Sequence, residues 1–71
     1  MKYDLVGVDG NAFCIMAYVT NAMHECGFSK QEQDSYFKNA TSGNYVHLVN
    51  VSLAMVEKCN EVADKKFYDK L

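Results

Sequence analysis

The sequence has no arginine, no tryptophan and no strong excess of charge of either sign. Its seven cationic residues are all lysines, and nine Asp and Glu residues oppose them, so the formal net charge is −2 at pH 7. Nucleic-acid-binding modules usually carry a basic surface in which arginine is prominent. The composition therefore disfavours a basic nucleic-acid-binding module.

Long apolar runs and a disulfide-type arrangement of cysteines are also missing. Residues 39–56 form the longest stretch without Lys, Asp or Glu, but they include several polar residues and are fewer than the ~20 apolar residues that span a bilayer. Asp4 and Asp9 interrupt the first apolar run, whereas the apolar region of a secretory signal peptide is uninterrupted. The cysteines are Cys14, Cys26 and Cys59. An odd number of cysteines at irregular spacing is a poor disulfide framework, so we expect a cytoplasmic protein. Because no apolar run is long enough to span a bilayer, we expect no association with a membrane.

The chain nevertheless contains enough apolar material for one small folded domain. It has 71 residues, of which 49% are apolar and 13% aromatic, whereas disordered tails are poor in apolar residues and highly charged. We predict a single all-α domain over residues 1–71. Its parts are a short extended N-terminal arm and three helices: residues 1–10, 11–26, 29–41 and 44–67.

A repeating apolar pattern supports the first predicted helix. Asp9-Gly10 suits a hairpin turn before a returning strand, and it equally suits the approach to a helix that Asp9 or Asn11 caps. Apolar residues at helical spacing favour the helix, because they fall on one face. They are Ala12, Ile15, Met16, Val19, Ala22, Met23 and Cys26. Gly27 is typical of the residue that follows a helix, because glycine readily takes a positive φ.

Local capping signals mark the next two helices. Ser29 with Glu32 three residues later forms a capping-box pattern. Gly43 is typical of the residue after a helix, and Asn44 of the cap before one. The third helix then begins near Tyr45. Its main apolar face consists of Tyr45, Leu48, Val49, Ser52, Met55, Val56 and Cys59.

Charge is concentrated in one part of the chain. Eight of the 16 charged residues fall in the last 15 positions, whereas residues 10–24 and 39–56 contain no Lys, Asp or Glu. A surface helix normally presents a charged face opposite its apolar one. We therefore predict a homodimer, or a docking surface for another protein, centred on the third helix at Val46, Val51 and Leu53; a monomer with a polar, weakly charged surface is the alternative.

The sequence offers ligand-type and nucleophilic residues but no pattern that joins them. His24 and Cys26 are two apart on a helix and point in opposite directions, so they cannot chelate one ion. Cys26 and Cys59 belong to apolar stripes and are expected to be buried. The glycines are isolated and form no phosphate-binding loop. We predict no catalytic residue, no metal site and no cofactor.

A helix-turn-helix DNA-binding regulator is the alternative function. The second helix, the Ser-Gly-Asn turn and the third helix have suitable lengths, and Gly43 and Val49 fit the motif. The presumed recognition helix, however, presents Asn44, Tyr45, His47 and Asn50. Because it has no cation for phosphate or guanine, nucleic acid is an unlikely partner.

Two segments resemble a group of short uncharacterised bacterial and phage-associated proteins. They are the V-G-x-D-G-N-A-F start at residues 6–13 and the A-T-S-G-x-Y-x-H-L joint at residues 40–48. Asn44 stands where that pattern has Asp. The resemblance implies a bacterial or mobile-element origin; it assigns no activity, cofactor or catalytic residue, because the function of those proteins is itself unassigned.

The same two segments place several polar residues at predicted helix ends. These residues, which we call the polar joint, are Asp9, Asn11, Thr41, Ser42, Tyr45 and His47. One hypothesis is that they converge into a single network linking the start of the first helix to the turn between the other two. The alternative is that they act as separate caps and turns, because these residue types favour helix ends in any case.

Overall fold

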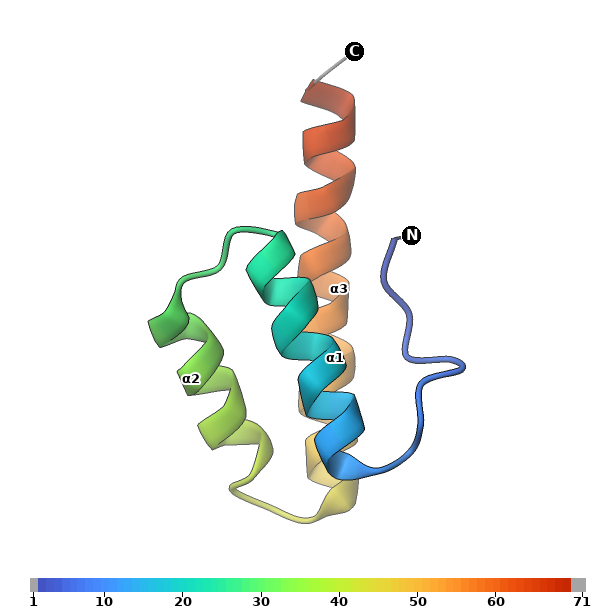
Figure 1. The fold of residues 1–71 in the computed structure, drawn as a ribbon, viewed down its shortest axis with the longest axis vertical. Helices are drawn as coiled ribbons and strands as arrows, with labels where there is room; N and C mark the ends of the chain where they lie inside the picture. The colour runs from blue at the N-terminus through green and yellow to red at the C-terminus, as the bar shows by residue number, and fades with distance from the viewer. Residues whose placement is uncertain (1, 70–71) are drawn as a thin grey trace.

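The structure is a bundle of three helices. The computed structural model describes residues 2–69, with the side chains of residues 2–66. It contains α1 (Ala12–Glu25), α2 (Lys30–Ala40) and α3 (Tyr45–Asp69), and no strand lies within the described residues. Figure 1 shows α1 and α3 running in the same direction and α2 running in the opposite one. The predicted all-α class is confirmed.

Local signals position both ends of α1. The Asn11 side chain accepts a hydrogen bond from the Phe13 amide, so Asn11 is the N-cap and the hairpin alternative is wrong. At the other end, the Gly27 and Phe28 amides donate to the carbonyls of His24 and Met23. Gly27 has a φ of 87°. This paired arrangement ends α1 as predicted and needs a residue that tolerates positive φ.

The capping box of α2 is confirmed, but the reason given for Gly43 is wrong. Ser29 and Glu32 exchange hydrogen bonds at the start of α2, and the Ser29 amide, with a smaller contribution from the Ser29 hydroxyl, lowers the pKa of the Glu32 carboxyl. Thr41 caps the other end without any positive φ. A Cβ atom on Gly43 would lie 2.9 Å from Cγ of His47. Glycine is therefore required here by a close side chain and not by its backbone conformation.

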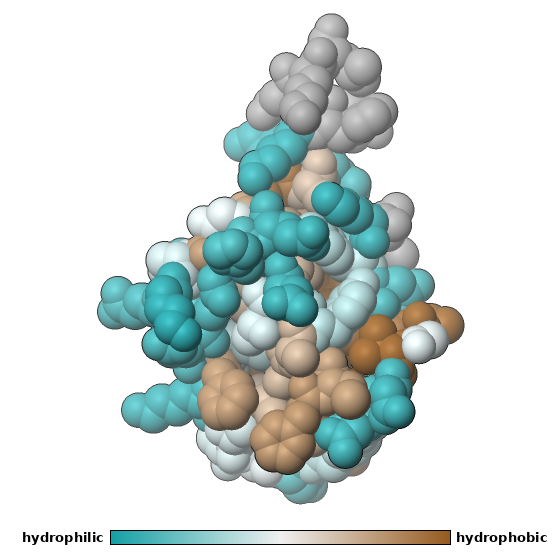
Figure 2. All heavy atoms as spheres, viewed as in Figure 1, coloured by the Kyte–Doolittle hydropathy of each residue, from teal (hydrophilic) through white to brown (hydrophobic). Residues whose placement is uncertain are grey.

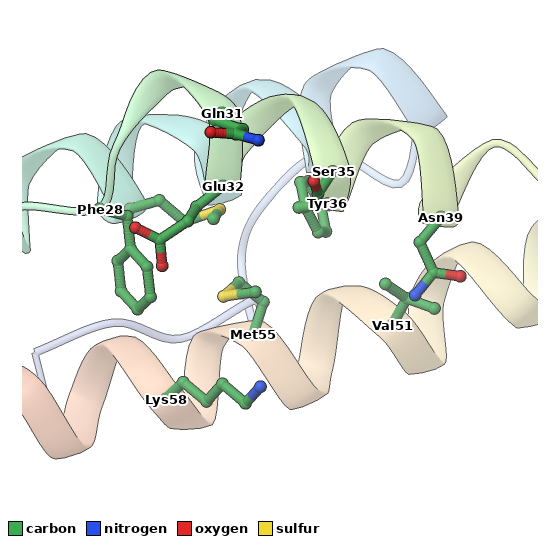
Figure 3. A pocket seen from close by; sticks show the side chains of 10 residues that line it. Phe28, Gln31, Glu32, Ser35, Tyr36, Asn39, Val51, Met55 and Lys58 are labelled. Carbon is green, nitrogen blue, oxygen red and sulfur yellow. The ribbon is translucent and has the colours of Figure 1, made fainter.

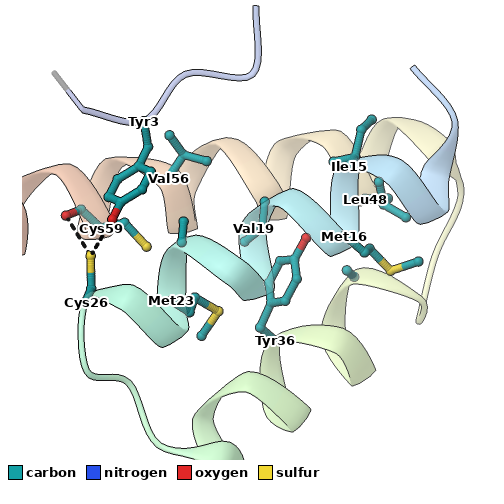
Figure 4. Close-up of a cluster of buried hydrophobic side chains, with 12 residues drawn as sticks. Tyr3, Ile15, Met16, Val19, Met23, Cys26, Tyr36, Leu48, Val56 and Cys59 are labelled. Carbon is teal, nitrogen blue, oxygen red and sulfur yellow. Dashed lines mark hydrogen bonds between the residues drawn. The ribbon is translucent and has the colours of Figure 1, made fainter. Parts of the chain in front are cut away.

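The core lies where α1 and α3 face each other, with α2 covering one side. The α1 stripe from Ile15 to Cys26 is buried as predicted, and Leu48, Ser52, Val56 and Cys59 are buried on α3. Figure 4 shows the hydrophobic members of this set meeting between the helices. Tyr36 of α2 reaches Ser52 through a buried hydrogen bond of 2.6 Å. Together these contacts hold the three helices in one arrangement.

The predicted extended arm is not supported. Residues 2–10 form no strand; they turn at the hydrogen bond from the Val8 amide to the Leu5 carbonyl and pack against α1 and α3. The Tyr3 amide donates to Oδ1 of Asn60 at 2.7 Å, and Nδ2 of Asn60 donates to the Tyr3 carbonyl at 2.9 Å. Asn60 therefore holds the segment through its backbone, and we call residues 2–10 the arm below.

No described helix has both the length and the apolar character required to cross a membrane.

Candidate interaction surface at one end of the bundle

Four of the six exposed large apolar side chains of the described residues lie at one end of the molecule; the other two are Val6 in the arm and Leu53 further along α3. Phe13 stands at the start of α1, Phe37 in the last turn of α2, and Tyr45 and Val46 at the start of α3. Figure 1 shows that these three helix ends meet at the lower end, and Figure 2 shows apolar side chains collecting there. We call these four residues the apolar end; Phe13 is 74% exposed and Val46 63%.

A shallow groove runs through the apolar end. It has a volume of about 320 Å³ and brings Phe13 of α1 next to Ala40 of α2 and Tyr45 of α3. None of its lining residues is Lys, Asp, Glu or His. A concave, uncharged surface with aromatic edges is the kind that a protein partner covers.

The first turns of α1 and α3 show the same lack of charge. The positive end of the helix dipole favours Asp or Glu in a first turn. The first turn of α2, at the opposite end of the molecule, contains Glu32. The first turns of α1 and α3 contain no acidic residue. The two uncharged segments of the sequence, 10–24 and 39–56, therefore place their helix starts together in one uncharged surface.

The polar joint forms two local clusters. In the first, Asp9 accepts from the Asn11 amide at 2.8 Å, and Asn11 caps α1. In the second, Oγ of Ser42 donates to the Asn39 carbonyl at 2.6 Å, and Nε2 of His47 lies 2.9 Å from the same carbonyl. Because a carbonyl oxygen only accepts, Nε2 carries the hydrogen in this arrangement.

One hydrogen bond connects the two clusters. The Tyr45 hydroxyl donates to the Gly10 carbonyl at 2.5 Å, so the start of α3 is tied to the approach to α1. Thr41 does not take part, because its hydroxyl donates to the carbonyls of Phe37 and Lys38 within its own helix. The polar joint is therefore a set of separate caps with a single bridge, and it forms the polar border of the apolar end.

Of the three residues predicted as the interaction surface, Val46 and Leu53 are seven residues apart and lie on one face of α3, about 10 Å apart along the helix, whereas Val51 lies on another face. Val46 belongs to the apolar end. Val51 is half-buried and lines a groove of about 440 Å³ between α2 and α3, where Figure 3 shows it near Met55 and Asn39. Leu53 is 50% exposed and lies beside the arm. The periodicity of α3 alone did not reveal where α2 and the arm cover it.

Buried thiols and a buried phenol meet at the opposite end of α1. Sγ of Cys26 donates to the Cys59 carbonyl at 3.4 Å and lies 3.7 Å from the Tyr3 hydroxyl (Figure 4). Burial, with Cys26 nearby, raises the pKa of Cys59 to about 12. Burial also raises the pKa of Tyr3, with contributions from Cys26 and Glu25. Cys59 therefore remains a thiol at neutral pH and is a poor nucleophile.

No described group of three His, Cys, Asp or Glu side chains is close enough to hold a metal ion. His47 is bonded to Asn39 and Ser42, and neither histidine has a hydrogen bond to a described cysteine or carboxylate. The arrangements required for metal binding or for a Cys-His nucleophile are thus not formed by the described residues.

The helix pair α2–α3 differs from a DNA-binding helix-turn-helix. The two helices of that motif cross at roughly 90–120°. Figures 1 and 3 show α2 and α3 running side by side in opposite directions. Residues 39–56, which include the turn and the start of α3, carry no lysine. No observation favours reading of DNA by this pair.

The sequence alone did not single out the exposed Phe13 and Phe37 or the buried Asn60. Phe37, in the last turn of α2, is 45% exposed. The only sequence signal for the burial of Asn60 is its spacing, which places it on the same side of α3 as Val56 and Cys59. The chain matches no family model, no curated protein and no solved structure in the comparisons made.

Proposed function

We propose that the protein is a small interaction module that self-associates through the apolar end and has no catalytic activity of its own. The observation that carries this proposal is that four exposed large apolar side chains lie at one end of the bundle, where two of them, Phe13 and Tyr45, line an uncharged groove. Exposed apolar patches with polar borders mark sites of association, because covering them releases water from apolar surface.

A second copy is the partner that suits this surface. A symmetric dimer places the same patch of each protomer against itself, so a charge close to the two-fold axis faces its own copy. The apolar end avoids that repulsion because its groove has no charged lining residue. The first turns of α1 and α3 contain no acidic residue, although Asp or Glu there would stabilise the helix through its dipole. This absence supports a surface that is uncharged because it is covered by a second copy.

This proposal moves the association surface from the middle of α3 to its start. Val46 remains part of it. Val51 packs against the core, and Leu53 lies on another part of α3, beside the arm. The proposal also includes Phe13, because the fold places the start of α1 at the same end of the bundle as the start of α3, which carries Val46 (Figure 1).

The oligomeric state of Phe13→Glu and Val46→Glu tests the proposal. Glu in a first helical turn is favoured by the helix dipole, so neither change should weaken the fold. Sedimentation of the wild type at micromolar concentration should give the mass of a dimer of the 8.0 kDa chain. Each variant should raise the dimer dissociation constant by roughly tenfold or more, since both protomers would then bury a carboxylate in an apolar contact.

Leu53→Glu is the matched control. It introduces the same charge on α3 at a similarly exposed apolar position away from the apolar end. The control should remain dimeric. A wild type that sediments as a monomer contradicts self-association, and a dimer that only Leu53→Glu dissociates contradicts the location.

We further propose that the module acts in the cytoplasm of the producing cell. Its three cysteines are free. Free cysteines are typical of a reducing compartment.

A further inference from the structure

A second surface groove lies between the arm and α3, away from the apolar end. It has a volume of about 330 Å³. Its apolar part consists of Leu5 from the arm with Leu53 and Val56 from α3, and Leu53 is half exposed. Figure 4 shows the arm passing along α3 beside Val56. The groove therefore has an apolar floor that is open to solvent on one side.

The charged residues that line this groove are all acidic. They are Asp4, Glu57, Glu61 and Asp64. The only ion pair among the described residues joins Lys30 to Asp34 on α2. Of the described lysines of α3, Lys58 lines the groove beside α2 and Lys66 donates to the Cys26 carbonyl, while Lys65, four residues after Glu61, makes no ion pair with a described residue. No lysine lining the groove neutralises the four carboxylates.

The spacing of the carboxylates suits a row of separate cations. Glu57, Glu61 and Asp64 are four and three residues apart on one face of α3, so they extend over about 10 Å at 1.5 Å per residue. No described group of three acidic, His or Cys residues is close enough to bind a single metal ion. Lysine or arginine residues with the same helical spacing on a partner can face all three carboxylates.

We propose that this groove binds a basic amphipathic helix of another protein, with an apolar side chain against Leu53 and cationic side chains facing Glu57, Glu61 and Asp64. The open apolar floor contributes affinity, and charge complementarity selects the partner and its orientation. Nucleic acids and anionic membranes are repelled by the same carboxylates. A symmetric contact with a second copy would bring the carboxylates of both copies together, so this binding is independent of the proposed self-association.

A synthetic helical peptide tests the proposal. The probe carries Leu along one stripe and Lys at positions i, i+4 and i+7 beside it, and its binding to the full chain is measured by fluorescence anisotropy. The wild type should bind it, and added salt should weaken binding because the charges are near the surface. The combined variant Glu57→Gln, Glu61→Gln and Asp64→Asn should bind at least about tenfold more weakly, as should Leu53→Ser. Circular dichroism checks that each variant remains folded.

Two controls separate this site from general attraction of opposite charges. Asp34→Asn removes an exposed carboxylate on α2 outside the groove and should leave peptide affinity unchanged. An oligolysine peptide of equal charge without the Leu stripe should bind much more weakly. Equal affinity of the wild type and the combined variant overturns the proposal, as does equal affinity for oligolysine. Self-association that is lost in the combined variant also overturns it, because the groove then belongs to a second copy.

Discussion

At the scale of single residues, the buried pair Tyr36–Ser52 should respond unequally to removal of either hydroxyl. Their oxygens are 2.6 Å apart, and both residues are almost fully buried. Ser52→Ala leaves the Tyr36 hydroxyl buried without a partner, which should cost about 1–3 kcal/mol of the free energy of unfolding. Tyr36→Phe should cost less, about 0.5–1.5 kcal/mol, because a serine hydroxyl within a helix can turn to the carbonyl four residues earlier.

Denaturant unfolding of both single variants and of the double variant measures this difference. The double variant should be closer in stability to Tyr36→Phe than the sum of the single losses implies, because no unpaired phenol remains. Additive losses, or a larger loss from Tyr36→Phe, would show that the hydroxyl pair does not connect α2 to α3 energetically.

Two glycines illustrate which residue roles the sequence reveals. The role of Gly27 was predictable, because the apolar stripe of α1 stops there and a positive φ requires glycine or little else. Gly43 was given the same role, but it accommodates the ring of His47 at close range. Composition at a turn indicates that glycine is needed, whereas the reason depends on side-chain placement that only the structure provides.

At the scale of elements, the arm depends on one side chain of α3. Asn60 makes two hydrogen bonds to the Tyr3 backbone, and Tyr3 itself is 5% exposed. Asn60→Ala should release the arm and lower the free energy of unfolding by about 1–3 kcal/mol, because buried backbone groups lose their partners. Hydrogen exchange of the Tyr3 amide measures the release directly, and its protection should disappear while the α1 core amides remain protected.

Asn50→Ala is the matched control for this prediction. Asn50 lies on the same helix but is exposed and makes no hydrogen bond to the described residues of the arm, so the control should leave arm protection unchanged. Tyr3 protection that survives Asn60→Ala would show that packing against Val56 and Cys26 holds the arm without the amide contacts.

The helices were predictable and the arm was not, for a physical reason. Helix starts depend on neighbouring residues such as Asn11 and the Ser29–Glu32 box, so a few letters of sequence indicate them. The arm depends on a contact across 57 residues between Tyr3 and Asn60. Its own letters suit an extended chain, but tertiary contacts with α1 and α3 decide its path.

At the scale of the whole molecule, the uneven charge of the sequence becomes two different surfaces. The uncharged segments meet at the apolar end, because α1 and α3 begin where α2 ends (Figure 1). The acidic residues of the last third of the chain lie along α3, where the arm adds Leu5 and Asp4. The segregation was visible in the sequence, but the grouping of Phe13 with Val46, and of Leu53 with the carboxylates, required the order and direction of the helices.

The core contains three groups that resist ionisation. Burial raises the pKa values of Tyr3 and Tyr36 above the ordinary 10.0, and that of Cys59 from 9.0 to about 12. In the unfolded chain these groups lose protons at their ordinary pKa values, whereas the folded chain retains them. Their contribution to stability is therefore fully present below about pH 9 and is lost as the pH rises from 9 towards 12.

We therefore expect alkaline destabilisation that depends on Cys59. Above its unfolded pKa, each such group should lower the free energy of unfolding by about 1.4 kcal/mol per pH unit. Denaturant unfolding between pH 8 and 11 measures this slope. Cys59→Ala should be less stable at pH 8 because its core packing is altered. Its free energy of unfolding should, however, fall less steeply with pH, by the contribution of one ionising group. Cys14→Ala, at an exposed position, should keep the wild-type slope; a slope unchanged in Cys59→Ala would mean that the Cys59 thiol ionises equally in the folded and unfolded chains.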